Sequence, residues 1–347
     1  GELDINTVDV TVAGDVTVSS GGVLSIGVSS VDGLSATNVT ISSGGQLVAD
    51  GASLITVSGN WSNSGTFTAS GSNVIFSGAS GTQTLAPGSS SFYNLTHSGA
   101  GTLLLGANTI VTNDLVNSAG TLNINTKNIT IGGDFTNSAT FTMASGTATF
   151  NGSTLQQLNS GGSNFANLVY SGSDTLSLLT NNLTLTGNLT ISSGELYANS
   201  LDISVGGNWT NNGTFTATDG LVTMTGSGKN ITGSSETSFY DLTIAGGATT
   251  NLITSAAVTG TLTTVLSGNI TIGGASEVTL TTSNVTNAGG ILFDASSAAV
   301  NLVLSDGATL TNSNFVEISD STYTITLSGT VGGNVETFTG NGIIMGD

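Results

Sequence analysis

The sequence predicts an all-β protein that forms a single parallel β-helix, or solenoid, with about 18 to 20 residues in each rung. Three observations predict this fold. Apolar and polar residues alternate in short runs that are broken by Gly, Asn or Ser. A higher-order unit of about 74 residues recurs along the chain. No segment shows a sustained helical apolar period with caps, so almost no helix is expected.

Composition supports a folded chain and excludes several functions. Hydrophobic residues make up 37% of the 347 residues and only one proline is present, so the chain is neither a polar disordered segment nor a proline-rich linker. With 21 acidic and 2 basic residues, the net charge is −19, which excludes a nucleic-acid partner and electrostatic membrane docking. There is no cysteine, hence no disulfide framework. No apolar run approaches the roughly 18 residues that a membrane span needs, so no membrane insertion is expected.

The repeat is visible in two independent sequence markers. The first is a decapeptide with the sequence Gly-Asn-Trp-Thr-Asn-Asn-Gly-Thr-Phe-Thr or a close variant, found at 59–68, 133–142 and 207–216. Its first aromatic residues, Trp61, Phe135 and Trp209, are separated by two equal intervals. The second marker, Phe-Tyr-Asn-Leu or a variant, is found at 92–95, 165–168 and 239–242. A degenerate fourth copy follows at 284–287 and 314–316, so the units are true tandem repeats.

Each unit divides into shorter segments of the length that one β-helix rung requires. Segments such as 201–220, 221–239 and 240–260 suggest four rungs in each repeat unit. Leu201, Ile203 and Val205 alternate with Asp202, Ser204 and Gly206, which places the apolar set in a narrow core. The chain is therefore expected to be one continuous solenoid over 1–347, with N-terminal rungs at 1–38, tandem repeats at 39–320 and a C-terminal rung or assembly segment at 321–347.

The sequence offers no catalytic, cofactor-binding or metal-binding residue. We expect Trp61, Phe135 and Trp209 to fill the core or corners of equivalent rungs; the alternative is a sugar-stacking platform. Lys127 and Lys229 both lie in Lys-Asn-Ile-Thr and are interpreted as surface charges, with an intramolecular isopeptide bond as the alternative.

Acidic residues are scattered singly, whereas a glycosidase needs two carboxyl groups close together. Only Glu2 with Asp4 and Glu317 with Asp320 are close along the chain, although carboxylates on neighbouring rungs could meet in space. His97 is the only histidine and is interpreted as a free histidine in a turn.

Two further patterns have weak functional meaning. Thr-x-Thr steps at 66–68 and 214–216 suggest ice binding, but they recur only once in each repeat and make no dense ladder. Asn-x-Ser/Thr sequons are about as frequent as the composition alone would give. They lie at Asn38, Asn60, Asn94, Asn128, Asn151, Asn182, Asn188, Asn208, Asn212, Asn230, Asn269 and Asn284.

The decapeptide at 207–216, with the strands at 222–226 and 238–244 that follow it, resembles the tandem repeats of large bacterial and archaeal surface proteins. Autotransporter passengers and filamentous-haemagglutinin-type adhesins are proteins of this kind. The resemblance covers residues 39–320, is specific to the architecture, and implies an exported right-handed β-helix that serves as a stalk, adhesin or surface layer. It carries no catalytic residue with it.

We therefore expect an extracellular structural protein rather than an enzyme: a secreted and processed β-solenoid subunit at the cell surface, with no cofactor. Strand-like alternation begins at 3–6 and is present at 343–347, with no polar cap visible at either end. Head-to-tail pairing with further copies of the chain, into a filament, sheath or adhesive fibre, follows as a hypothesis. The alternatives are a carbohydrate-binding adhesin segment of a longer surface protein whose partners are surface glycans, a polysaccharide-active enzyme, and an ice-binding protein.

Overall fold

The computed structural model describes residues 1–5, 8–27, 33–294, 299–312, 315–318, 325–327 and 343–345, and within these ranges every regular element is a β-strand. The chain divides into two units. Unit 1 comprises Gly1–Ala166 and Leu179–Asn181, and unit 2 comprises Asn167–Leu178 and Asn182–Asp347. The prediction of an all-β protein is confirmed.

Short strands follow one another closely along both units. Those of unit 1 are β1 (Glu2–Ile5), β2 (Val10–Thr11), β3 (Val16–Val18), β4 (Val23–Ile26), β5 (Gly33–Ala36), β6 (Val39–Ile41), β7 (Gln46–Ala49), β8 (Leu54–Val57), β9 (Trp61–Asn63), β10 (Thr66–Thr68), β11 (Asn73–Phe76), β12 (Thr82–Ala86), β13 (Asn94–His97), β14 (Thr102–Leu105), β15 (Thr109–Val111), β16 (Leu115–Asn117), β17 (Thr121–Asn125), β18 (Ile129–Ile131), β19 (Phe135–Asn137), β20 (Thr140–Met143), β21 (Thr147–Phe150) and β22 (Gln156–Asn159). Those of unit 2 are β23 (Asn167–Tyr170), β24 (Thr175–Leu178), β25 (Leu183–Leu185), β26 (Leu189–Ile191), β27 (Glu195–Tyr197), β28 (Ile203–Val205), β29 (Trp209–Asn211), β30 (Thr214–Thr216), β31 (Leu221–Met224), β32 (Lys229–Thr232), β33 (Thr237–Phe239), β34 (Asp241–Ile244), β35 (Thr249–Leu252), β36 (Ala256–Thr264), β37 (Asn269–Ile272), β38 (Val278–Asn287), β39 (Gly290–Phe293), β40 (Val300–Asn312), β41 (Phe315–Ile318), β42 (Ile325–Leu327) and β43 (Ile343–Met345).

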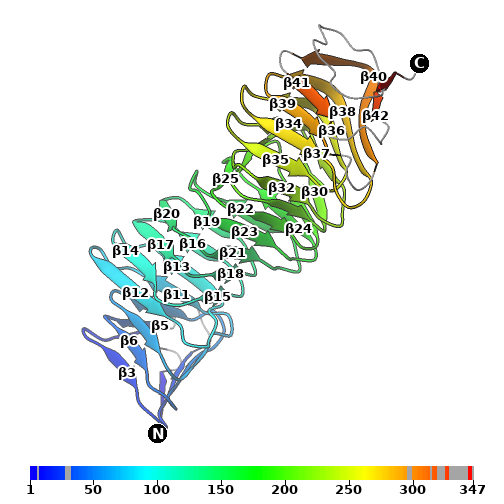
Figure 1. The fold of residues 1–347 in the computed structure, drawn as a ribbon. Helices are drawn as coiled ribbons and strands as arrows, with labels where there is room; N and C mark the ends of the chain where they lie inside the picture. The colour runs from blue at the N-terminus through cyan, green and yellow to red at the C-terminus, as the bar shows by residue number, and fades with distance from the viewer. Residues whose placement is uncertain are drawn as a thin grey trace. The chain divides into compact units, whose positions relative to one another are not determined.

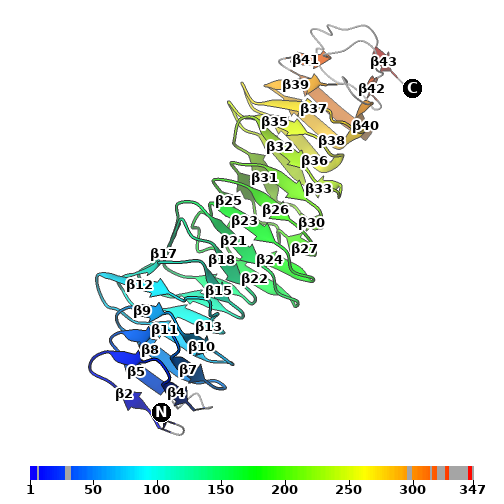
Figure 2. The same cartoon turned by 60° about the horizontal axis from the view of Figure 1, so that its bottom comes forward.

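The strands of unit 1 stack in parallel ladders, as Figures 1 and 2 both show. The ladder orders are β1-β4-β7-β10, β2-β5-β8-β11-β13-β16-β19-β22, β3-β6-β9-β12-β14-β17-β20 and β15-β18-β21. Successive strands of one ladder are mostly three strands apart in sequence, so the chain winds from one sheet to the next and returns to the first one rung later. This is the parallel β-helix that the alternation predicted.

Unit 2 has the same construction. Its ladders run β23-β26-β29-β32-β35-β37-β39-β41, β24-β27-β30 and β25-β28-β31-β34-β36-β38-β40, and β33 also pairs with β36. Apart from the β42-β43 pair, the predicted C-terminal segment 321–347 lies outside the described residues.

Alternation along each strand builds the core. In β28, Ile203 and Val205 are buried while Ser204 between them is partly exposed, as predicted; Leu201 lies before the strand and is partly exposed. Parallel pairing in register then stacks each inward side chain on the inward side chain of the residue that it pairs with in the next rung. The apolar interior is thus a column of Val, Ile, Leu and Phe side chains enclosed by the sheets.

A typical rung has about 20 residues, at the upper end of the predicted range. Leu95 pairs with Leu115, and Leu115 pairs with Phe135, so these two successive rungs are equal in length. The rungs that follow the aromatic marker are longer: Trp61 pairs with Leu85, and Phe135 pairs with Leu158. The repeat therefore contains rungs of unequal length.

The expected division of the repeat into four equal rungs is wrong. In the sheet that contains Phe135, the residue stacked three rungs before Phe135 is Val74, and the residue stacked four rungs before it is Ile55. Trp61, the equivalent of Phe135 in the preceding repeat, lies between these two positions and belongs to a different sheet. One repeat therefore spans more than three rungs and fewer than four, so the marker moves to another sheet.

The same offset is present in unit 2. The residue stacked three rungs after Trp209 is Ile272, and the residue stacked four rungs after it is Phe293. The equivalent residue of the fourth copy, Val285, lies between them on β38, in another sheet. Repeat-equivalent residues therefore do not stack on each other within either unit.

Candidate functional site

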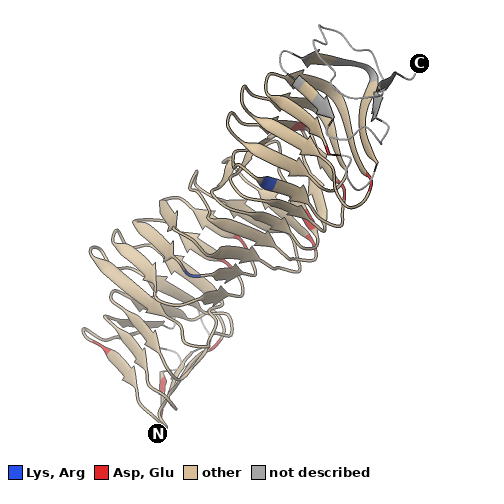
Figure 3. Cartoon of the chain, in the orientation of Figure 1, with Lys and Arg blue, Asp and Glu red and all other residues tan. Residues whose placement is uncertain are grey.

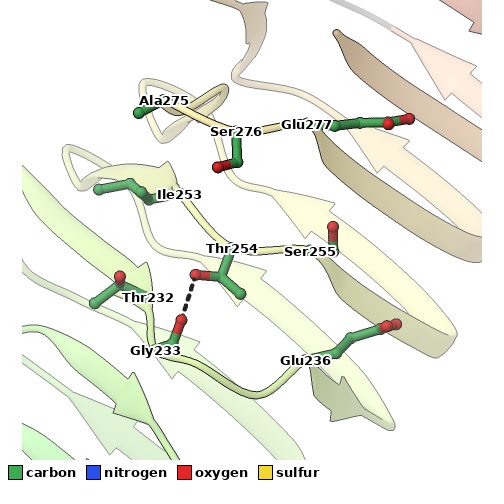
Figure 4. A pocket seen from close by; sticks show the side chains of 9 residues that line it. All are labelled: Thr232, Gly233, Glu236, Ile253, Thr254, Ser255, Ala275, Ser276 and Glu277. Atoms are coloured by element: carbon green, nitrogen blue, oxygen red, sulfur yellow. Dashed lines mark hydrogen bonds between the residues drawn. The ribbon is translucent and has the colours of Figure 1, made fainter. Parts of the chain in front are cut away.

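Unit 2 contains a groove of about 470 Å³ across three successive corners of the coil. Its lining contains two carboxylates. The groove lies where the chain passes from β32, β35 and β37 to β33, β36 and β38. Figure 4 shows Glu236 and Glu277 extending to the same side of the groove, one from each outer corner, with Ser255 on the corner between them. The remaining lining residues are Thr232, Gly233, Ile253, Thr254, Ala275 and Ser276.

Some polar groups of the groove are occupied by hydrogen bonds to neighbouring rungs. The hydroxyl of Thr254 donates to the carbonyl of Gly233 over 2.9 Å, and Asn301 Nδ2 donates to Glu277 Oε1 over 2.7 Å. Neither a histidine nor a lysine is among the described residues that line it. The groove therefore brings two carboxylates to one side of the coil, as the sequence left open, and surrounds them with hydroxyl, amide, backbone and apolar groups.

Acidic residues elsewhere are dispersed along both units (Figure 3). Glu2 and Asp4 lie on the exposed strand β1, where Ser25 Oγ donates to Glu2 Oε1 over 3.4 Å. Asp320 and the side chain of Glu317 lie outside the described residues. Across the described ranges, no group of three His, Cys, Asp or Glu side chains is arranged to hold a metal ion.

The aromatic markers belong to the core. Trp61, Phe135 and Trp209 are at most 1% exposed, so the sugar-stacking alternative is excluded for these rings. Each ring contacts the Phe of its own Thr-Phe-Thr strand and the Phe of the second marker. In the Trp209 cluster the ring centroids lie 4.7 Å from Phe215 and 5.1 Å from Phe239. The two sequence markers are therefore two halves of one aromatic cluster.

The asparagine of the aromatic marker holds the long rung in place. Asn137 Nδ2 donates to the Ser160 carbonyl over 2.8 Å, and Asn63 Nδ2 donates to the Pro87 carbonyl over 2.9 Å. Asn211 bonds to the equivalent corner of unit 2, next to Gly233. Gly233 has φ of +141°, and a Cβ there would overlap the Asn211 carbonyl oxygen, so only glycine fits.

Corner asparagines also explain the sequons. At eight of the sequons the side-chain carbonyl of the asparagine accepts a hydrogen bond from a backbone N–H of the next rung, as when Asn188 Oδ1 accepts from Asn208 N over 2.8 Å. The Ser or Thr two residues later lies in or beside the strand that begins there. The sequon asparagines described as accepting such bonds are Asn38, Asn60, Asn94, Asn128, Asn182, Asn188, Asn208 and Asn212.

His97 is not a turn histidine. It is the last residue of β13, is 0% exposed, and its Nδ1 lies 2.8 Å from Asn117 Oδ1. Asn117 Nδ2 in turn donates to Asn137 Oδ1 over 2.7 Å. Burial lowers the pKa of His97 below its ordinary value of 6.5, and the hydrogen bond to Asn117 opposes this shift. The interpretation of His97 as a free histidine in a turn is wrong, because the residue follows the inward register of Leu95 along β13.

The remaining residues singled out from sequence are on the surface. Lys127 and Lys229 are partly exposed. In the Thr-x-Thr steps the threonines flank a buried Phe and point outward, and Thr216 Oγ1 donates to Glu195 Oε1 over 2.6 Å. The steps at 66–68 and 214–216 are single, as predicted.

Comparison of the chain with models of protein families, with curated protein sequences and with solved structures gave no match. Along the described part of the chain, no helix has the length and apolar character needed to cross a bilayer.

Proposed function

We propose that this protein is an extracellular structural protein, a β-solenoid subunit that self-associates head to tail into a surface filament, sheath or adhesive fibre. The observation that carries the proposal is the edge formed by β1, β2 and β3. Among the described residues each of these strands pairs on one side only, with β4, β5 and β6 respectively. The other side of each strand can serve as a template for a further parallel strand, which in this proposal the next copy of the chain supplies.

The same edge exposes apolar side chains. Leu3 is 61% exposed and lines a hollow of about 380 Å³ together with Val16, Val18 and Leu24. Covering this hollow with the rung of another subunit would bury apolar surface, and each Å² buried would stabilise the contact by about 25 cal/mol. The same contact would give the backbone groups of the edge strands hydrogen-bond partners. A contact between an edge and a different surface of the next copy is heterologous, and repetition of such a contact gives an open polymer.

Location outside the cell is supported by the resemblance of the repeats to surface proteins and by a surface of hydroxyl and amide groups rather than of charges. The repeated markers add support for a structural role, because their residues hold rungs together: the aromatic rings are in the core and the corner asparagines bond rung to rung.

Negative-stain electron microscopy and sedimentation of the purified chain over a range of concentrations test the proposal. Leu3→Asp places a carboxylate in the apolar hollow and should abolish polymers. Leu155→Asp is the matched control, because Leu155 is 54% exposed within unit 1 but lies between β21 and β22, away from the edge. Discrete monomers of the unsubstituted chain at high concentration, or equal assembly by both variants, would refute the proposal.

A further inference from the structure

One sheet of unit 2 carries a column of hydroxyl groups on its outer surface. One outward residue in each of seven successive strands is Thr or Ser, and these residues pair with one another in register. The column, called here the hydroxyl ladder, consists of Thr184, Ser204, Thr223, Thr243, Thr263, Thr286 and Thr311. With strands about 4.8 Å apart, the ladder extends over about 29 Å.

The hydroxyls of the ladder are free to bind a ligand. In the described part of the chain no hydrogen bond from these side chains is found, although other surface hydroxyls bond back to the coil. Thr225 Oγ1, for example, donates to the Val205 carbonyl over 3.2 Å. Each ladder hydroxyl can both donate and accept one or more hydrogen bonds, so the column is a regular array of two-way hydrogen-bonding groups.

The borders of the ladder differ in chemistry from its centre. On the N-terminal side of the strands, Tyr240 is 37% exposed, and the chain positions beside it on the neighbouring rungs are Gly220 and Gly260. Two glycines leave the aromatic ring without side-chain neighbours in its own column. Along the same border, Asp241 Oδ1 accepts from Thr261 N over 2.7 Å. On the opposite border, Val265 is 41% exposed.

These features together favour a neutral polysaccharide over a protein partner. The ladder face covers about 300 Å², taking seven strands at about 4.8 Å and a width of about 10 Å, well below the roughly 800 Å² per partner of a stable protein interface. A sugar chain needs no such area, because its hydroxyls can meet the ladder hydroxyls one after another. Asp241, beside the ladder, repels anionic polymers. An exposed aromatic ring offers a face on which a sugar ring can stack.

We propose that the hydroxyl ladder binds an extended neutral polysaccharide that lies along it, with Tyr240 as the stacking platform at its border. The ladder belongs to unit 2, whereas the edge proposed for self-association is formed by β1, β2 and β3 of unit 1. Polysaccharide binding and self-association can therefore be tested independently of each other.

Binding to insoluble polymers tests the ladder directly. The probes are microcrystalline cellulose and chitin as neutral polysaccharides and calcium alginate as an anionic one, with bound protein measured by depletion. We expect retention on at least one neutral polymer and none on alginate. The triple variant Thr223→Val, Thr243→Val and Thr263→Val keeps the shape of the side chains and should bind at least about tenfold more weakly, since each lost hydrogen bond removes roughly a factor of two to ten.

Matched controls separate the ladder from general surface effects. Thr190→Val with Thr210→Val makes the same substitution on the neighbouring sheet, where these residues pair in register, and should leave binding unchanged. Tyr240→Ala should weaken binding several-fold, and thermal melting checks that each variant is folded. No retention on cellulose or chitin, preference for alginate, or equal binding by the triple variant would overturn the proposal. Uptake of the chain into growing ice without retention on either polysaccharide would overturn it too, and would assign the ladder to ice instead.

Discussion

Acidification should destabilise unit 1 because the imidazole of His97 is held neutral in the core. Asn117 donates both of its amide hydrogens, to Asn137 Oδ1 and to the Thr140 carbonyl, so its Oδ1 must accept from His97. The proton of the neutral ring is therefore on Nδ1. The other ring nitrogen, Nε2, is buried and has no hydrogen-bond partner among the described residues. Protonation would place a charged N–H there with nothing to accept it.

The sign and the size of the effect follow from proton linkage. The folded protein has a His97 pKa below 6.5, whereas the unfolded chain has the ordinary value. Well above pH 6.5 both states are neutral and the full stability is present. As the pH falls below 6.5 the unfolded chain binds the proton first, so stability decreases until the lowered folded-state pKa is reached. One proton gives at most about 1.4 kcal/mol for each pH unit in this window.

Urea unfolding between about pH 7.5 and pH 5 measures this slope, in a range above the ordinary carboxylate pKa values. A Trp209→Phe background leaves Trp61 as the only tryptophan, so fluorescence reports on unit 1. His97→Asn removes the titration and continues the amide column of Asn117 and Asn137, and its stability should not change over the same range. A flat pH profile for the histidine protein, or the same slope in the asparagine variant, would refute the assignment of a neutral buried imidazole.

Three further pairs of substitutions test how the coil is held together. Trp209→Ala should cost about 3–5 kcal/mol of unfolding free energy, whereas Trp209→Phe should cost much less because Phe occupies the equivalent place in another repeat; chemical denaturation compares them. Thr250→Val should raise the free energy of unfolding by about 1–2 kcal/mol, because the buried hydroxyl of Thr250 has no partner among the described residues. Thr264→Val should lower it, because the hydroxyl of Thr264 donates to Asn287 and accepts from Gly289 N. Melting temperatures that shift in opposite directions would confirm both predictions. Asn188→Ala should cost about 0.5–1.5 kcal/mol and Asn188→Asp less, because the aspartate can still accept from the next rung; equal losses in urea titrations would contradict the ladder bond.

Local patterning was sufficient to predict the fold class and the core. Alternation alone identified the inward residues of β28, and the rung length followed from the spacing of turn residues. Burial of Trp61, Phe135 and Trp209 also followed, since an aromatic residue that recurs in an alternating context is most simply a core residue. The contacts between the two markers did not follow, because Phe92 and Trp61 meet only after the chain has completed a long rung.

Which residues stack on each other between rungs is harder to predict from sequence, because the rungs differ in length. Ile55 pairs with Val74 across a short rung, whereas Phe135 pairs with Leu158 across a longer one. A division of the repeat into equal parts therefore assigns the wrong neighbours after one or two rungs. His97 shows the result: its inward position depends on register with Asn117 and Asn137, and no feature of its immediate sequence indicates a buried amide column.

The hydroxyl ladder cannot be predicted from sequence for the same reason. The positions of its residues within the repeat strengthen the case for a function. A Thr-x-Thr step lies within a single strand, whereas the ladder is formed by one residue from each of seven strands. Subtracting one or two repeats from Thr223 gives Thr149 and Ile75, which lie on β21 and β11 in two different sheets of unit 1. Because one repeat is not a whole number of rungs, duplication cannot by itself place threonines in a single column. The ladder residues occupy unrelated positions of the repeat, so what they share is the face they lie on, and a feature shared by a face is what a ligand lying along that face would require.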